Sequence, residues 1–277
     1  MEFCLIYPVK EGYCSPETVK RVAVAAEEEG FHSLLVWDHY LVPGGPETLD
    51  AWTLLSYVAG VTTSIRLGTV VTPIPFRPPA QLAKIAATVD ILSGGRVTLG
   101  VGAGWHQPEF DGFSRWASNR VRVDQTTEAL DLMVRLWKGE PVDFAGEHYS
   151  VTGAQIAPTP VQKPHPPMWF GTRGKRMMEL AARYGDGWIP TNIEPDEYRL
   201  GLEKLRSRRR ELGVPGDLKA ALQHFTAFTD AQEFLATIES YADAGCDYYG
   251  AVWSYPPDEM VSRIKWFGRE VMPHVTA

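Results

Sequence analysis

An acid, an imidazole and a phenol follow one another at the end of a short apolar run. The run Ser33–Trp37 (SLLVW) is typical of a buried β-strand, and Asp38, His39 and Tyr40 come directly after it. Histidine titrates near neutral pH, so His39 could transfer a proton to or from a substrate, with Asp38 as its carboxylate partner. The structural alternative is that Asp38 caps a turn and His39 is solvated.

A second segment, Gly100–Trp105 (GVGAGW), follows another strand-like run and carries glycine at alternate positions. Glycine lets a flat ring or a phosphate approach the backbone, which makes Gly102 and Gly104 candidate binding residues. As a dinucleotide-binding motif the segment is weak, because no helix is expected directly behind it. Crowded packing would explain the same glycines.

A third segment, Gly171–Gly174 (GTRG), precedes an expected helix. Free N–H groups and the helix dipole at such a turn attract anions, and Thr172 and Arg173 add a hydroxyl and a cation. This turn is a candidate phosphate site, although a plain strand-to-helix turn with solvated cations has the same composition.

These segments must be positioned by a regular succession of elements. Strand-like runs are Glu2–Tyr7, Ser33–Trp37, Ile65–Val71, Arg96–Val101, Met168–Phe170, Trp188–Pro190, Lys219–Thr226 and Tyr248–Trp253. Helical patterns follow at Pro16–Glu29, Asp50–Thr62, Pro79–Leu92, Arg120–Lys138, Gly174–Tyr184, Pro195–Leu212, Ala231–Ala244 and Pro257–Val271.

Strands that are apolar on both faces, each followed by a helix, indicate an α/β fold with a parallel sheet. Eight such units predict a closed (β/α)8 TIM barrel, expected as a single domain over residues 1–277. A doubly wound open sheet is the alternative, but the first turn, YPVKEGYCSP, lacks the glycine-rich pattern of that fold. Between about 141 and 167, after the fourth helix, we expect a β-hairpin insertion and a proline-rich connector.

Composition excludes several function classes. Lys plus Arg number 27 against 34 Asp plus Glu, and this net charge of -7 argues against nucleic acid or an anionic membrane as a partner. Cys4, Cys14 and Cys246 form neither a disulfide framework nor a CxxC motif, which fits a reducing cytoplasm. The histidines show no metal-ligand spacing, and we expect neither a signal peptide, a membrane span nor a metal site.

The segment Thr72–Phe110 (TPIPFRPPAQLAKIAATVDILSGGRVTLGVGAGWHQPEF) resembles the bacterial luciferase-like family of flavin and deazaflavin oxidoreductases. The FAGEHY hairpin, the PTPVQKPHPP connector and the GDGW of Gly185–Trp188 are similar too, so the resemblance covers essentially the whole chain. It implies a barrel with insertions, a flavin-like cofactor at the carboxyl ends of the strands, a small-molecule substrate and a homodimer.

Two branches of this family compete. One uses FMN with oxygen, and the other uses the deazaflavin coenzyme F-420 as a hydride carrier without oxygen. Asp38-His39 resembles the sequence of the deazaflavin branch at this position. Many FMN-dependent members have Glu-His there instead. The resemblance therefore implies hydride transfer between F-420 and a small organic substrate. An FMN-dependent monooxygenase or oxidoreductase is the first alternative, and a non-catalytic flavin-binding barrel is the second.

The resemblance also assigns roles to residues. Asp38 would lie beside the cofactor ring, and His39 would be the acid or base at the substrate. Glu109, a carboxylate in the loop after the fourth strand, is a further catalytic candidate from the residues themselves. The remaining residues would bind the cofactor: a cis peptide at Thr69-Val70 and Gly102 and Gly104 at the ring, and Gly171, Thr172, Arg173 and Gly174 at the phosphate.

Overall fold

The computed structural model describes residues 1–42, 45, 47–226 and 231–275. Its strands are β1 (Glu2–Tyr7), β2 (Ser33–Val36), β3 (Arg66–Thr69), β4 (Thr72–Pro73), β5 (Val97–Gly102), β6 (Val142–Ala145), β7 (Ser150–Ala154), β8 (Met168–Phe170), β9 (Gly187–Trp188), β10 (Lys219–Phe225) and β11 (Tyr248–Val252). Its α-helices are α1 (Pro16–Glu28), α2 (Ala51–Val61), α3 (Pro79–Leu92), α4 (Gln107–Phe113), α5 (Asn119–Leu136), α6 (Lys175–Tyr184), α7 (Pro195–Glu211), α8 (Ala231–Asp243) and α9 (Pro257–Glu270). Two short 3-10 helices, η1 (Ile74–Phe76) and η2 (Met272–His274), complete the elements.

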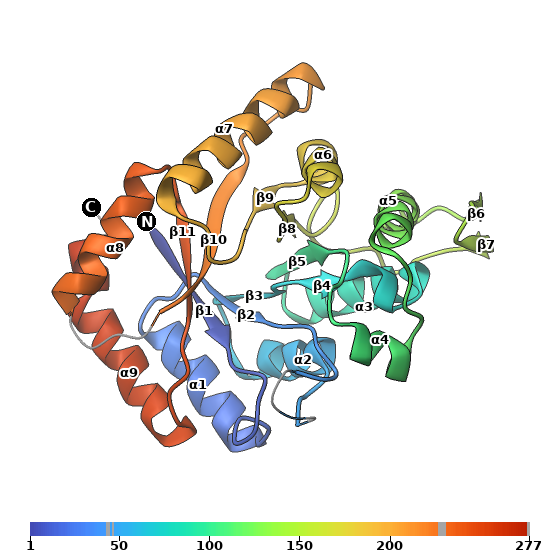
Figure 1. Ribbon diagram of the computed structural model, residues 1–277. Coiled ribbons are helices and arrows are strands. Elements are labelled where there is room, and N and C mark those ends of the chain that lie inside the picture. The colour runs from blue at the N-terminus through green and yellow to red at the C-terminus, as the bar shows by residue number, and fades with distance from the viewer. Residues whose placement is uncertain (43–44, 46, 227–230, 276–277) are drawn as a thin grey trace.

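The strands form a closed parallel barrel. Their order is β3-β2-β1-β11-β10-β9-β8-β5-β4, and β3 also pairs with β5, which closes the ring. The segments β3 and β4 lie on either side of Val70 and Val71 and both pair with β5, so together they occupy one strand position. The eight positions and the helices outside them confirm the predicted (β/α)8 TIM barrel (Figure 1).

Alternation along each strand divides the core into two layers. Leu5 and Tyr7 of β1 point outward to the helices, whereas Cys4 and Ile6 point into the barrel. The interior is filled by buried side chains: Cys4, Ile6, Leu35, Val70, Trp169, Ile189, Ala221 and Val252. A barrel packed in this way is not a pore, so a ligand can bind only at its mouth.

Side chains at helix starts explain where several helices begin. Ser15 precedes α1 and accepts a hydrogen bond from the N–H of Thr18 at 3.1 Å. Asp50 precedes α2 and accepts from the N–H of Thr53 at 2.8 Å. The other carboxylate oxygen of Asp50 accepts a hydrogen bond from Arg77, so this cap also connects α2 to the residue that ends η1.

Between α5 and β8 the chain leaves the barrel pattern. The strands β6 and β7 pair antiparallel inside the range 141–167 and lie beyond α5 at the edge of the molecule (Figure 1). Glu128 of α5 accepts hydrogen bonds from the N–H groups of Glu147 and His148 at the hairpin turn, at 2.9 and 3.0 Å. These contacts fix the hairpin to the barrel.

One helix was not expected from the sequence. The seven residues of α4 begin three positions after Gly104, whereas we expected no helix directly behind the glycine segment. A Pro in its first turn favours a helix start, but so short a helix carries no periodic apolar pattern. Within the described residues, no helix is long and apolar enough to span a membrane.

Candidate active site

The carboxyl ends of the strands open into a cavity of about 1420 Å³. The loops after β1, β2, β3, β5, β8 and β9 and the end of β10 supply its walls, as expected for the active-site face of a barrel. The functional candidates that line it are His39, Val70, Gly102, Gly104, Glu109, Gly171, Thr172, Arg173 and Gly174. The structure thus brings together residues that are as far as 135 positions apart, from His39 to Gly174.

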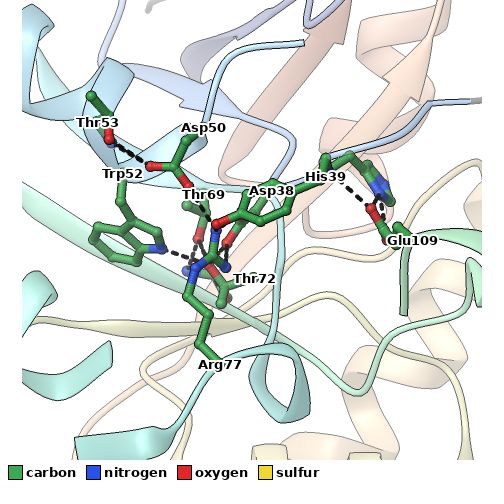
Figure 2. A network of polar contacts seen from close by, with 11 residues as sticks. Asp38, His39, Asp50, Trp52, Thr53, Thr69, Thr72, Arg77 and Glu109 are labelled. Atoms are coloured by element: carbon green, nitrogen blue, oxygen red, sulfur yellow. Dashed lines mark hydrogen bonds and ion pairs between the residues drawn. The ribbon is translucent and has the colours of Figure 1, made fainter. Parts of the chain in front are cut away.

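His39 pairs with Glu109. The imidazole Nδ1 lies 2.9 Å from one carboxylate oxygen of Glu109 and 3.1 Å from the other. Glu109 is fully buried in the first turn of α4, and the backbone N–H of Tyr40 donates to it at 3.1 Å. Figure 2 shows the two side chains pointing toward each other. The carboxylate partner of His39 is therefore Glu109, where the sequence suggested Asp38.

Asp38 points the other way, into a buried ionic network. Arg77 donates from both terminal nitrogens to its two oxygens at 2.7 Å, and the hydroxyl of Thr72 adds a bond at 2.8 Å (Figure 2). Asp38 is fully buried, and among the described residues the cavity lining includes its neighbours Trp37 and His39 but not Asp38 itself. The structure places Asp38 in a buried network behind the cavity lining, and its position beside a cofactor ring stays a prediction.

The same network contains a second acid. Burial alone would lower the pKa of Arg77, but the charge of Asp38 outweighs that cost and the pKa of Arg77 is raised. Burial alone would raise the pKa of Asp50, yet the hydrogen bonds from Thr53 and the guanidinium of Arg77 hold it below its ordinary value. The contacts of Arg77 with Asp38 and Asp50 tie η1, α2 and the end of β2 together.

The backbone at the end of the third barrel strand carries a cis peptide between Val70 and Val71. This is one residue later than Thr69-Val70, where the resemblance had placed it. Val70 and Val71 line the cavity, whereas the hydroxyl of Thr69 accepts a hydrogen bond from the N–H of Gly100 at 3.1 Å inside the barrel wall. Among the described residues that line the cavity, Val70 is therefore present and Thr69 is not.

Three glycines are required by close packing around these residues. A Cβ on Gly102 would lie 2.5 Å from a methyl of Val71, and one on Gly171 would lie 2.7 Å from its other methyl. Gly104 has a φ of +80°, and a Cβ there would meet the ring of Phe110 at 2.6 Å. Packing thus accounts for these glycines, and all three also line the cavity.

The far end of the cavity is cationic. Gly174 is the N-cap of α6, and no side chain among the described residues caps this helix, so its first-turn N–H groups can meet a ligand. Arg173, Lys175 and Arg176 line the cavity beside this terminus, together with Arg120 of α5. The indole of Trp188 donates to the carbonyl of Thr172 at 2.7 Å and fixes the turn.

The sequence missed several of these residues. Arg77 lies in a quoted motif, but its pairing with Asp38 across 39 positions leaves no local signal. Arg120 lines the cationic end from the start of α5. The available clue to this end in the sequence was the basic pair Lys175-Arg176 at the start of α6. Arg176 is also tied by an ion pair to Asp124 of α5, so these two helices meet at the cationic end.

Comparison with known proteins places the chain in a family. The sequence model of a family described as luciferase-like monooxygenase matches residues 3–265. The F-420-dependent hydroxymycolic acid dehydrogenase of Mycobacterium tuberculosis is 36% identical over 182 residues, which are 64% of this chain and 50% of that protein. The match therefore spans about half the length of this relative.

Solved structures agree on the fold. A monooxygenase from Streptomyces bottropensis superposes with a TM-score of 0.86 at 22% identity. An F-420-dependent secondary alcohol dehydrogenase, solved with an F-420–acetone adduct, superposes with a TM-score of 0.84 at 23% identity. Each comparison covers 99% of both chains. Since the family model matches nearly the whole sequence, the chain belongs to the luciferase-like monooxygenase family.

Proposed function

We propose that this protein is an oxidoreductase that transfers hydride between the deazaflavin coenzyme F-420 and a small organic substrate. The observation that carries the proposal is the His39–Glu109 pair, a single proton-transfer pair at the surface of a large cavity. The relative from Mycobacterium tuberculosis, named for its dependence on F-420, supports this choice of cofactor.

The residues present fit such a cofactor. F-420 has a flat tricyclic ring and a phosphate-bearing chain, and the cavity has a wall of valine side chains and glycine backbone and a cationic end. Val70, Val71 and Gly102 would hold the ring, and Thr172 to Lys175 with the first turn of α6 would hold the phosphate. When bound, a deazaflavin supplies a carbon centre that accepts or donates hydride and does not activate oxygen.

The protein then has to move one proton. Because Nδ1 of His39 faces the carboxylate of Glu109, that nitrogen carries a proton toward Glu109 and Nε2 is left for the substrate. With the imidazole protonated, Nε2 would donate to a substrate oxygen during reduction, and it would accept that proton in the reverse direction. Glu109 holds the ring orientation and stabilises the charged imidazole.

Cofactor binding tests the proposal directly. Purified protein is dialysed to equilibrium against F-420 and, separately, against FMN, and protein that retains a cofactor from expression is denatured and its extract identified by absorbance. We expect F-420 to be retained more strongly than FMN, and NADPH alone not to be oxidised because no dinucleotide-binding motif follows β1. Retention of FMN with oxygen uptake would instead assign the alternative monooxygenase function.

A further inference from the structure

The cavity is larger than one ligand requires. Pockets for a single small molecule usually measure about 300–1,000 Å³, whereas this cavity has about 1420 Å³. Its two sides also differ in chemistry. The cofactor candidates lie on β4, β5, β8 and the start of α6, while the side formed by β1, β2 and β10 is lined mainly by apolar and aromatic groups.

Two aromatic rings meet across this second side. Trp37 follows β2 and Phe225 ends β10, and their ring centroids are 5.6 Å apart at 31° although β1 and β11 lie between their strands. Phe225 is 49% exposed, so this pair presents aromatic surface to the cavity. Val9 and Val42 extend the apolar lining from the neighbouring loops. We call Trp37, Phe225, Val9 and Val42 the aromatic wall.

A second aromatic surface flanks the proton-transfer pair. Trp105 is 63% exposed, lines the same cavity, and its ring centroid lies 5.7 Å from that of His39. Large aromatic surfaces exposed in a cavity are stabilised when a ligand covers them. His39 shares the cavity with both surfaces and follows Trp37 by two positions. A ring system held there would bring its substituent to the imidazole.

This side carries few charged groups. Among the described residues that line it, Lys10 donates to the hydroxyl of Ser254 at 3.0 Å, and Glu109 is paired with His39. Most of the cations that line the cavity lie instead at the opposite end, near the start of α6. A charged substrate group would have to be desolvated against the four side chains of the aromatic wall, which supply no ion partner, and this is costly.

We propose that the aromatic wall binds an uncharged carbonyl compound with a flat apolar ring system and presents its carbonyl to Nε2 of His39. This inference rests on the proposed function. When bound, reduced F-420 would supply hydride to the carbonyl carbon and be oxidised. The C=O π bond would break, and the oxygen would take a proton from Nε2 of His39. The product is the alcohol, and His39 regains its proton from solvent.

The experiment compares three probes that separate ring, charge and carbonyl: 2-acetylnaphthalene, 2-naphthoate and acetone. Binding is measured by equilibrium dialysis with protein carrying oxidised F-420, so that no turnover occurs, and the KM values of the two ketones are measured with reduced F-420. We expect 2-acetylnaphthalene to bind at least about tenfold more tightly than either other probe, because ring contact and burial favour it. Equal or tighter binding of naphthoate or acetone would overturn the proposal.

Variants locate the site. Trp37→Ala and Phe225→Ala should each weaken 2-acetylnaphthalene binding by about tenfold, while Trp37→Phe should restore much of it. Leu92→Ala is the matched control, since it removes a side chain that is 63% exposed and lies outside the cavity. Unchanged affinity in both alanine variants would place the ring elsewhere. Phe225 is exposed, so its variant remains informative if Trp37→Ala fails to fold.

The experiments distinguish failure of the proposed function from failure of the substrate inference. If F-420 does not bind, the proposed function fails, and dialysis of the probes against protein without cofactor still measures the aromatic wall. If F-420 binds but the naphthyl ketone shows no advantage, only the substrate inference fails.

Discussion

Two buried carboxylates lie close together at the barrel mouth, and their partners differ. Asp38 is bound by both terminal nitrogens of Arg77 and by Thr72, whereas Glu109 is bound by the imidazole of His39 and the N–H of Tyr40. Both carboxylates are fully shielded from solvent. Arginine keeps its charge at every accessible pH, but an imidazole does not. The first region is therefore a fixed structural network, and the second is coupled to a proton that can move.

The largest effect is expected at His39. His39→Ala removes the proton donor at the substrate oxygen, and general acid–base catalysis of this kind contributes about 10²–10⁴ in rate. We expect turnover of the cofactor-loaded enzyme to fall by that factor while F-420 affinity measured by dialysis stays within a few-fold, because the cofactor candidates lie on other strands. A variant that keeps its turnover and pH profile would remove His39 from the mechanism.

Asp38→Asn should act on stability. Breaking a buried ion pair costs 3–5 kcal/mol, and we expect about 3 kcal/mol in the free energy of unfolding, because Asp50 still pairs with Arg77 at 2.9 Å. The measurement is denaturant unfolding of the two proteins at neutral pH.

The matched control for this variant is Asp131→Asn, which breaks an exposed pair with Arg135. It should change stability by no more than about 0.5 kcal/mol. If Asp38→Asn instead unfolds like the wild type but loses hydride transfer, the division between a structural and a chemical carboxylate is wrong.

Glu109→Gln should have a smaller effect on rate than loss of His39. The amide can still accept from Nδ1–H, but it no longer compensates the charge of a protonated imidazole. We expect a fall in kcat that is smaller than in His39→Ala, together with a changed pH profile. A change confined to KM would indicate that Glu109 acts only in substrate binding.

The barrel could be predicted from the sequence, and the pairing within the site could not. Strands such as Met168–Phe170 are recognised from local apolar runs, and the structure has β8 at those residues. The partner of His39 lies 70 positions away on a helix too short to show periodicity, and the partner of Asp38 lies 39 positions away. Because Asp38 and His39 are adjacent in the chain, the sequence suggested that they form a pair. Successive side chains of an extended segment point to opposite sides, so the two residues have different partners.

The smallest effect is expected at the cationic end. Substitutions of two glycines there distinguish an effect on ligand binding from an effect on core packing. A Cβ on Gly174 meets nothing within 4 Å, so Gly174→Val should fold normally and place its branched side chain at the uncapped start of α6. We expect about tenfold weaker F-420 binding, because the backbone N–H groups there would be shielded from the phosphate.

Gly171→Val provides the comparison, since its Cβ would lie 2.7 Å from a methyl of Val71. This variant should lose stability to denaturant as well as affinity, because the core beside the cavity cannot accept the added volume without shifting. Unchanged affinity in Gly174→Val, with the fold intact by circular dichroism, would show that the phosphate binds away from α6. The residues around Val71 and the aromatic wall would then be the parts of the cavity that hold the ligands.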